Sequence, residues 1–465
     1  MHIDYKRLGD KAMRSSGRSA LVLSASILAL AVATPVSASG PGASQTNGAQ
    51  ADVDATLTIS NIGDDFESGD TDVANPANAV VNDFLTGQVI QTGSATVFDL
   101  DMEILNEGEF NIAAIASASG GLGADASADV TAGIIQQGTG ATGAALVIDN
   151  SGPLGVAASA FASASSINAF ADAYIGTGID QDAVATSGDA SAALVNSGAL
   201  AITADAVALG AAIPSGDASA AIGVGISQDA AASNVGNASA LLTNSGAIDI
   251  TADASAIGVS SADAEADVNV GIDQYAFVDG TGNALASIDN TGVVTIAAAA
   301  NADANDADAS ASVDTGIDQF AYVLGEGDAS ALLANSGTIA ITANASAAGA
   351  SDASADAEID SQGVYQSASV NGTGNALASI DNSGVITIAA AANAVATTGD
   401  ASASATVDSG IAQYAYADTG NASALLTNSG TIAIVADASA AGATSADAEA
   451  DVYYGIEQEA QVNGV

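Results

Sequence analysis

Apolar and polar residues alternate with a period of two over long stretches of this chain. From Ala262 to Val270 the order is Ala, Asp, Ala, Glu, Ala, Asp, Val, Asn, Val, which gives a β-strand one small apolar face and one acidic face. Segments 306–313, 338–345 and 400–407 alternate similarly. Alanine is the best helix former, but a helix would spread these carboxylates around its circumference. With 50 glycines at turn-like intervals, the pattern predicts strand-turn-strand repetition.

The alternating segments belong to an internal repeat. An Asn-x-Gly signature recurs nine times, at spacings of 44 to 48 residues, and Ile or Leu stands two positions before each Asn. In eight of the nine repeats apolar residues also stand four and six positions after the Asn. A second signature, Gly-Ile-x-Gln or a looser variant, places a Gln 29 to 32 residues after each Asn. The signature begins at Asn61, Asn106, Asn150, Asn196, Asn244, Asn290, Asn335, Asn382 and Asn428.

Short strands that cannot bury a face alone, repeated in register, predict an all-β protein built as a β-solenoid, or parallel β-helix. We expect about nine 46-residue repeats over residues 53–465, with an interior of Ala, Ile, Leu and Val. Each repeat is either one wide coil or two coils of half that length. We favour two coils, which would stack roughly eighteen coils into a rod about 90 Å long. The first repeat departs from the rule at Asp65, as a cap would.

The recurring Asn and Gln side chains predict ladders of amides that hydrogen-bond from coil to coil. We expect the Gly two positions after each Asn to supply a turn with positive φ. The alternative is that these are ordinary turn and surface residues. The candidate ladder residues are Asn196, Asn244, Asn290, Asn335, Asn382, Asn428, Gln181, Gln228, Gln274, Gln319, Gln366 and Gln413.

The N-terminal residues read as an export signal. Basic residues from Lys6 to Arg18 precede an apolar segment at 20–32 and a small-residue cleavage site at 36–38, as in a secretory signal peptide. We therefore assign 1–38 to the signal, 39–52 to a flexible linker and 53–465 to the repeats. No later segment has the length and hydropathy of a membrane span, so direct membrane insertion of the repeat region is not expected. The chain has no cysteine, which excludes disulfides and thiolate metal sites.

Charge changes the picture beyond the signal. All Lys and Arg residues and the single His lie at or before Arg18, whereas all but two of the 54 acidic residues lie after it. Nucleic acid is excluded as a partner because phosphate binding depends on Lys and Arg. Catalysis by His, Lys or Cys is also excluded beyond the signal, which leaves carboxylate pairs such as those of glycosidases. Because the carboxylates look interchangeable and solvated, we do not expect an enzyme.

The carboxylates gather in short alternating clusters. In register they would form acidic columns on adjacent coils, and Ca²⁺ is a natural extracellular partner for oxygen ligands. The alternative is a solvated face that keeps an alanine-rich protein soluble. No glycine-rich aspartate nonapeptide of the calcium β-roll type is present. The Ca²⁺ candidates are Asp263, Glu265, Asp267, Asp356, Glu358, Asp360, Asp447, Glu449 and Asp451.

Aromatic residues follow the Gln in several repeats. Pairs occur at Tyr275 and Phe277, at Phe320 and Tyr322, and at 414 and 416. Counted by alternation from Ile272, these rings point outward. They could hold sugars or a partner surface, or they could simply stack on one another.

Two resemblances suggest a biological setting. Segments such as Leu426 to Ile432 and Ile380 to Ile386 resemble the I-x-N-x-G-x-I repeats of bacterial autotransporter and large adhesin passengers, which implies a parallel β-helix displayed on the cell surface. Those proteins end in a membrane β-barrel, whereas this sequence stops at Val465 inside a repeat, so it is a fragment or is anchored differently. The stretch 280–292 is more loosely similar to curlin repeats, which implies polymerising matrix amyloid.

We therefore expect an exported, non-catalytic structural or adhesive repeat protein at the bacterial cell surface or outside the cell. The alternative is a self-assembling, curli-like subunit of an extracellular matrix or layer, whose assembly depends on cations because like charges repel. Expected partners are other copies of the chain, a host or abiotic surface, or extracellular polysaccharide. No cofactor other than Ca²⁺ is expected.

Overall fold

The computed structural model describes the backbone of residues 45–51, 55–61, 66–75, 78–95, 99–120, 123–166, 168–210 and 215–464, and within these ranges the side chains from Val89 onward. The expected signal peptide lies outside the described residues. Within them the fold is all-β and no helix is found, which confirms the predicted fold class. It follows that the described part contains no helix able to span a membrane. Strand β1 (Gln45–Ala51) lies inside the segment expected to be a linker and pairs with β4 (Asn78–Ala95).

Each repeat contains a short strand that ends at the signature Asn, a first long strand that follows it, and a second long strand that carries the Gln. The short strands are β2 (Ala55–Asn61), β5 (Asp99–Asn106), β8 (Gly143–Asn150), β11 (Ala190–Asn196), β14 (Ala238–Asn244), β17 (Ala284–Asn290), β19 (Ala329–Asn335), β21 (Ala376–Asn382) and β24 (Ala422–Asn428).

The two long strands of each coil run in opposite directions. First long strands are β3 (Phe66–Asn75), β6 (Phe110–Gly120), β9 (Pro153–Ala164), β12 (Ala199–Gly210), β15 (Ala247–Ile257), β22 (Val385–Ala396) and β25 (Thr431–Gly442). Second long strands are β1, β4, β7 (Gly123–Gly140), β10 (Ala169–Ala185), β13 (Gly216–Val235), β16 (Ser261–Thr281), β23 (Asp400–Thr419) and β26 (Ser445–Val462). Strands β18 (Val293–Glu326) and β20 (Thr338–Thr373) each contain both.

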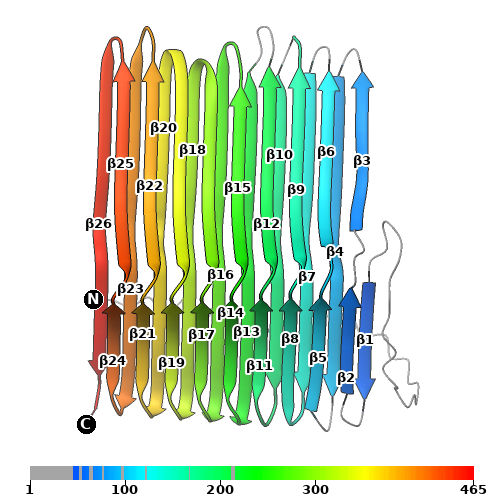
Figure 1. Cartoon of the computed structure of the whole chain (residues 1–465), viewed down its shortest axis with the longest axis vertical. Coiled ribbons are helices and arrows are strands. Elements are labelled where there is room, and N and C mark those ends of the chain that lie inside the picture. The colour runs from blue at the N-terminus through cyan, green and yellow to red at the C-terminus, as the bar shows by residue number, and fades with distance from the viewer. Residues whose placement is uncertain are drawn as a thin grey trace. The chain divides into compact units, whose positions relative to one another are not determined.

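All neighbouring strands pair in parallel, one repeat apart. Short strands form a nine-stranded sheet and long strands a seventeen-stranded sheet, and the colours of Figure 1 advance coil by coil along the stack. Leu200 pairs with Ile248, which pairs in turn with Val294 of the next coil. One repeat is therefore one wide coil, and the expectation of two coils per repeat is wrong. The nine stacked short strands span about 40 Å at about 4.8 Å per coil, rather than about 90 Å.

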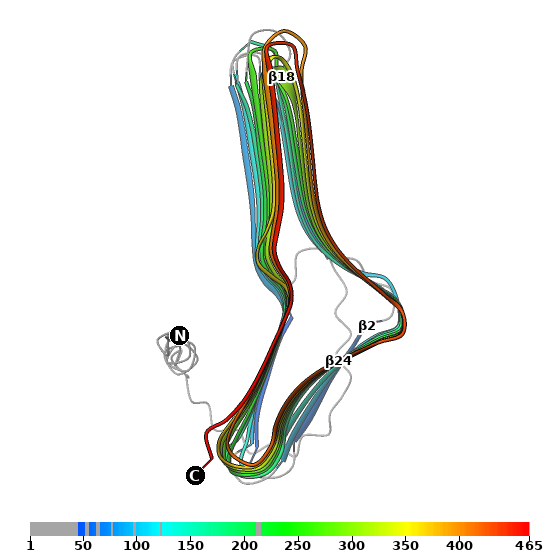
Figure 2. The same cartoon turned by 90° about the vertical axis from the view of Figure 1, so that its left-hand side faces the viewer.

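Side-chain size explains the cross-section of each coil. The two long strands lie side by side in the upper part of Figure 2 and separate below, where the second long strand faces the short strand. Alanines such as Ala206 and Ala220 fill the narrow part, and their small side chains let the two walls approach closely. The largest buried residues, including Leu194, Ile202 and Ile226, occupy the core where the three strands meet. The repeated Ile, Leu and Ala positions therefore set the shape of the coil.

The alternation read from the sequence appears as alternating burial. In β12, every second residue from Leu200 to Gly210 is buried while the residues between them face outward. From Asn106 to Asn382 the apolar positions around each signature Asn are all buried, as for Ile248 and Ile250. In the last described coil Ile432 and Ile434 are only partly buried. Coil stacking, rather than packing within one coil, therefore completes the core.

Candidate functional site

The signature Asn side chains form a buried ladder along the stack. The Asn196 Nδ2 donates a hydrogen bond to the Asn244 Oδ1 at 2.8 Å, and the Asn244 Nδ2 donates to the Asn290 Oδ1 at 2.8 Å. The same bond links every consecutive pair from Asn106 to Asn428. From Asn150 to Asn382 each amide is buried and paired, which is the condition for a polar group inside a core. The predicted Asn ladder is confirmed.

The Gly of the Asn-x-Gly signature has a different role from the one expected. None of the described signature glycines, from Gly108 to Gly430, is among the residues with positive φ. A Cβ on Gly198 would instead lie 2.2 Å from the Gly152 carbonyl oxygen of the preceding coil. The position needs glycine because the corners of consecutive coils approach so closely, and the expectation of a positive-φ turn is wrong.

The Gln side chains form a second buried ladder that runs in the opposite direction. The Gln274 Nε2 donates to the Gln228 Oε1 of the preceding coil at 2.9 Å, and also to the Ser287 carbonyl oxygen of its own short strand at 3.1 Å. Equivalent amide bonds link consecutive coils from Gln91 to Gln458. This ladder therefore joins coil to coil and also fixes the second long strand to the short strand.

A third ladder, which sequence reasoning missed, lies on the surface before each short strand. The Asn237 Oδ1 accepts a hydrogen bond from the Asn283 backbone N–H, and the Asn283 Oδ1 accepts one from the Asp328 backbone N–H, both at 2.9 Å. The residue before each member is a glycine with positive φ, such as Gly282 at 153°. The Gly-Asn/Asp-Ala motif precedes the last six short strands, from β11 to β24, and was the signal that could have revealed it.

The acidic clusters stack on one another only in part. Glu265 pairs in register with Ser310, and Ser310 pairs with Asp356 of the next coil. Carboxylates and serines alternate in this way through eight coils, in the order Ser127, Asp172, Ser219, Glu265, Ser310, Asp356, Ser404 and Glu449. Carboxylates within this column are therefore separated by two coils, about 10 Å. The expectation of acidic columns on adjacent coils is therefore wrong for Glu265, but it is confirmed for Asp263, which lies between Asp217 and Asp308 of the adjacent coils.

The alternation follows from a two-repeat period that sequence reasoning missed. Residues 283–290 and 375–382 are identical, whereas the equivalent residues 328–335 of the repeat between them differ. The Ser312 Oγ donates a hydrogen bond to the Asp267 Oδ1 at 2.7 Å. In these two columns a serine therefore separates the carboxylates and can solvate them, which lowers the like-charge repulsion along each column.

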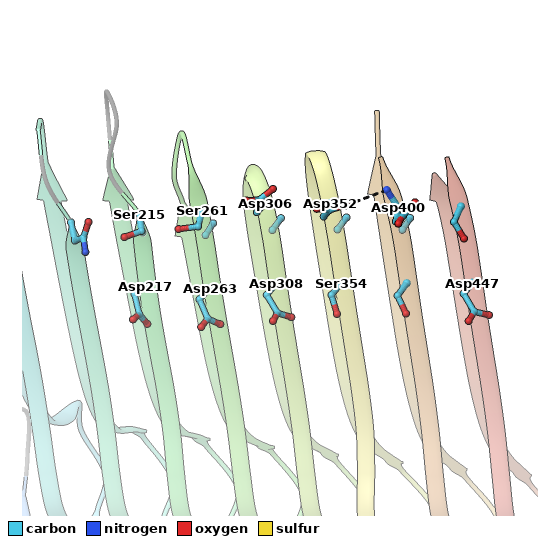
Figure 3. Close-up of a pocket in the computed structure, with 18 of the residues that line it drawn as sticks. Ser215, Asp217, Ser261, Asp263, Asp306, Asp308, Asp352, Ser354, Asp400 and Asp447 are labelled. Carbon is cyan, nitrogen blue, oxygen red and sulfur yellow. Dashed lines mark hydrogen bonds between the residues drawn. The ribbon is translucent and has the colours of Figure 1, made fainter. Parts of the chain in front are cut away.

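We call the outer face of the second long strands, which carries these carboxylates, the acidic face. A shallow groove crosses the top of it. It has a volume of about 760 Å³ and is lined by two rows of polar residues from consecutive second long strands. Figure 3 shows Asp306, Asp352 and Asp400 in one row and Asp217 and Asp263 in the other, all directed outward from the coils. Three acidic coils adjoin in the first row, where the Asp400 backbone N–H donates to the Asp352 Oδ1 at 3.3 Å. Seven of the residues that line the groove are aspartates.

The candidate Ca²⁺ ligands lie on this acidic face but do not converge. Partial burial and the neighbouring Asp217 and Asp308 raise the pKa of Asp263, and partial burial and Asp267 raise that of Glu265. Residues two apart on one strand stand about 7 Å from each other and point in parallel directions. Among the described residues, no three carboxylates come close enough to hold one metal ion. The face can hold cations as a diffuse atmosphere, without an assembled Ca²⁺ site.

The outward aromatic rings contact one another. Phe277 and Tyr322 of adjacent coils stack with centroids 5.7 Å apart and planes at 8°. Phe320 contacts Tyr365 at 5.1 Å, and Tyr365 contacts Tyr414 at 5.6 Å. Sequence reasoning missed Tyr365, which precedes its Gln instead of following it. Neighbouring rings cover part of each other's faces, so the strip offers less free aromatic surface to a sugar than separate rings would.

One carboxyl departs from the rest. Burial, and then the neighbouring Asp182, raise the pKa of Asp180 to about 6, while a hydrogen bond with Gln137 acts in the opposite direction. Asp180 and Asp182 stand two residues apart on the outer face of β10. A raised carboxyl pKa beside a second carboxylate is the arrangement required of a general acid. The sequence suggested that the carboxylates are interchangeable. Asp180 is an exception.

These features define a parallel β-solenoid whose interior polar residues join the coils and whose outer faces differ in charge. No protein-family model, curated protein or solved structure matches the chain.

Proposed function

We propose that this protein is an exported, non-catalytic rod that acts at the bacterial cell surface or outside the cell as an adhesive or spacer element. The observation that supports this proposal most is the unbroken register of the coils from β5 to β24, in which the conserved polar positions of the repeat join one coil to the next. Such stacking makes a rigid element whose length is set by the number of repeats. The export signal read from residues 1–38 supports a location outside the cell.

The rod presents a strongly anionic surface, because no Lys, Arg or His follows Arg18. Its partners are surfaces or polymers that do not depend on protein cations for recognition. We expect a host or abiotic surface, an extracellular polysaccharide or other copies of the chain, and no nucleic acid.

The test uses cells that produce the chain with an epitope inserted after Asn463. External protease should remove the epitope from intact cells, and deleting the protein should reduce attachment to surfaces or matrix. An Asp180→Asn variant should restore attachment as well as the native chain does, because no step of the function is catalytic. An epitope that is cleaved only after lysis contradicts the location. A folded Asp180→Asn variant that fails to restore attachment contradicts the non-catalytic role.

A second candidate is a self-assembling matrix or layer subunit. Each amide ladder keeps one polarity through all the coils where it is described, so another copy stacked in line could continue both ladders. Like-charge repulsion opposes such stacking until cations screen it. Light scattering of the purified protein, titrated with Ca²⁺ and with Na⁺ at matched ionic strength, separates the candidates. Ordered fibres in Ca²⁺ alone favour the subunit, whereas a monomeric β-rich protein in both salts favours the rod.

A further inference from the structure

A second groove, whose lining includes one carboxylate, Asp437, lies on the outer face of the first long strands, away from the acidic groove. It has a volume of about 410 Å³ and crosses β18, β20, β22 and β25. Alanines such as Ala299 and Ala391 line it together with serines and three asparagines, Asn301, Asn344 and Asn393. We call this feature the amide groove.

The asparagines of the amide groove are staggered along the stack. Asn344 aligns with Ala299 of the preceding coil and Ala391 of the next. Asn301 and Asn393 stand two positions further along their strands and both align with Ser346 of the coil between them. Each of the first three coils thus contributes one amide, on alternating sides of the groove, and the fourth coil contributes Asp437, which aligns with Ala391. This stagger follows from the two-repeat period, since a one-repeat period would place all three amides in a single column.

The fold itself does not use these amides. All three side chains are exposed, and within the described part of the chain they make no hydrogen bond. The other recurring asparagines are each bonded from coil to coil. Asparagine is depleted in strands, where its short polar side chain competes with the ladder. Three unpaired amides in the middle of adjacent strands are therefore more economically explained by a ligand than by stability.

We propose that the amide groove binds an extended, uncharged polysaccharide chain that lies along the stack with one sugar unit per coil. The coils advance by about 4.8 Å, which is close to the advance per sugar in an extended β-1,4-linked chain. Successive sugars of such a chain turn to opposite sides, as the three amides do. Each amide offers donors and an acceptor to hydroxyl groups, and the alanines leave room for the sugar rings.

Charge favours an uncharged glycan over a polyanionic one. The chain carries no cation beyond Arg18, so a uronate polymer would be repelled by the whole rod. The proposal rests on the proposed adhesive function for its biological meaning, and it names the partner of that function. Binding is nevertheless a property of the purified protein, so the two can fail separately.

The test is calorimetric titration of the full chain with a soluble, unbranched cello-oligosaccharide long enough to span the groove. The variant Asn301→Ala/Asn344→Ala/Asn393→Ala should weaken binding by at least about tenfold, because it removes several hydrogen bonds. The control Thr295→Ala/Thr342→Ala/Thr387→Ala removes three polar side chains from the same coils and the same face, outside the groove lining. It should bind within about twofold of the native protein. Circular dichroism confirms that both variants keep the fold.

Four results would overturn the proposal. The first is no binding by the native chain, and the second is equal binding by the native chain and the asparagine variant. The third is concentration-dependent self-association in sedimentation that the asparagine variant abolishes while no glycan binds, since the occupant would then be a second copy. A uronic oligosaccharide that binds more tightly than the neutral one would likewise show the assigned ligand class to be wrong. Exposure of the epitope on intact cells, tested separately, would still support the surface location.

Discussion

Replacing one residue of the buried Asn ladder tests how the coils are held together. Asn244 is fully buried, and its Nδ2 donates to the Asn290 Oδ1 at 2.8 Å and to the Val293 carbonyl oxygen at 3.0 Å. It also accepts from the Asn196 Nδ2 at 2.8 Å. In Asn244→Ala the buried Asn290 Oδ1 loses its donor, and Asn196 loses one of its acceptors. At about 1 to 3 kcal/mol per buried group left unpaired, the variant should lose about 2 to 4 kcal/mol.

Two further Asn→Ala changes in the same rod calibrate this loss. Asn283 belongs to the exposed ladder, where its Oδ1 accepts one backbone hydrogen bond, so Asn283→Ala should cost about 0.5 to 1.5 kcal/mol. Asn301 is exposed and makes no hydrogen bond among the described residues, so Asn301→Ala should stay within about 0.5 kcal/mol of the native protein. The three variants remove the same atoms and differ only in burial and bonding.

Urea unfolding followed by circular dichroism measures the free energy, and amide hydrogen exchange locates the change. Local exchange is needed because a repeat protein can unfold partially, coil by coil. Protection should fall most in the coils on either side of Asn244. If Asn244→Ala is within about 0.5 kcal/mol of Asn301→Ala, the ladder does not stabilise the stack and the reasoning is refuted.

Three further predictions concern titration, packing and surface charge. A raised carboxyl pKa means that the folded state binds protons more tightly than the unfolded state, so Asp180 should stabilise the fold at low pH and lose that contribution as the pH rises from 3.8 to about 6. Thermal melts should show this fall in the native chain and a smaller fall in Asp180→Asn. In Gly178→Ala the new Cβ would lie 2.5 Å from the Ile202 Cδ1 and 2.6 Å from the Gly225 carbonyl oxygen, so unfolding should become easier by about 1 to 3 kcal/mol, whereas an unchanged urea midpoint would contradict the packing described here. Ser310→Asp would place a carboxylate between Glu265 and Asp356. The melting temperature of this variant should fall at low salt and recover at about 1 M NaCl, where surface charges are screened. Ser310→Ala is the matched control, and equal melting temperatures of the two variants at every salt concentration would contradict the role of charge spacing.

Much of the inner structure could be predicted because repetition supplies the neighbours. When Asn196 of one coil lies beside Asn244 of the next, every inward column consists of equivalent residues, so the amide ladders follow from spacing alone. The arrangement of the outward residues was predicted less well. An acidic column on adjacent coils was correctly expected at Asp263 but wrongly expected at Glu265, because the two-repeat alternation that places Ser310 beside Glu265 was overlooked, although the sequence contains it. The positive-φ role of the Asn-x-Gly glycine was wrong because close approach between coils is a property of the stack.

By itself the sequence determined that the chain is all-β, that its repeat is about 46 residues long, and which side of each strand is buried, because alternation and period are local properties. Only the tertiary structure decided that one repeat makes one coil. The width of a coil depends on where the chain turns back to meet its own next repeat, and alternating residues look the same in a narrow coil and a wide one. Tertiary structure also decided which outward residues share a face, since the amide groove and the acidic face exist only once residues from different repeats are brought side by side.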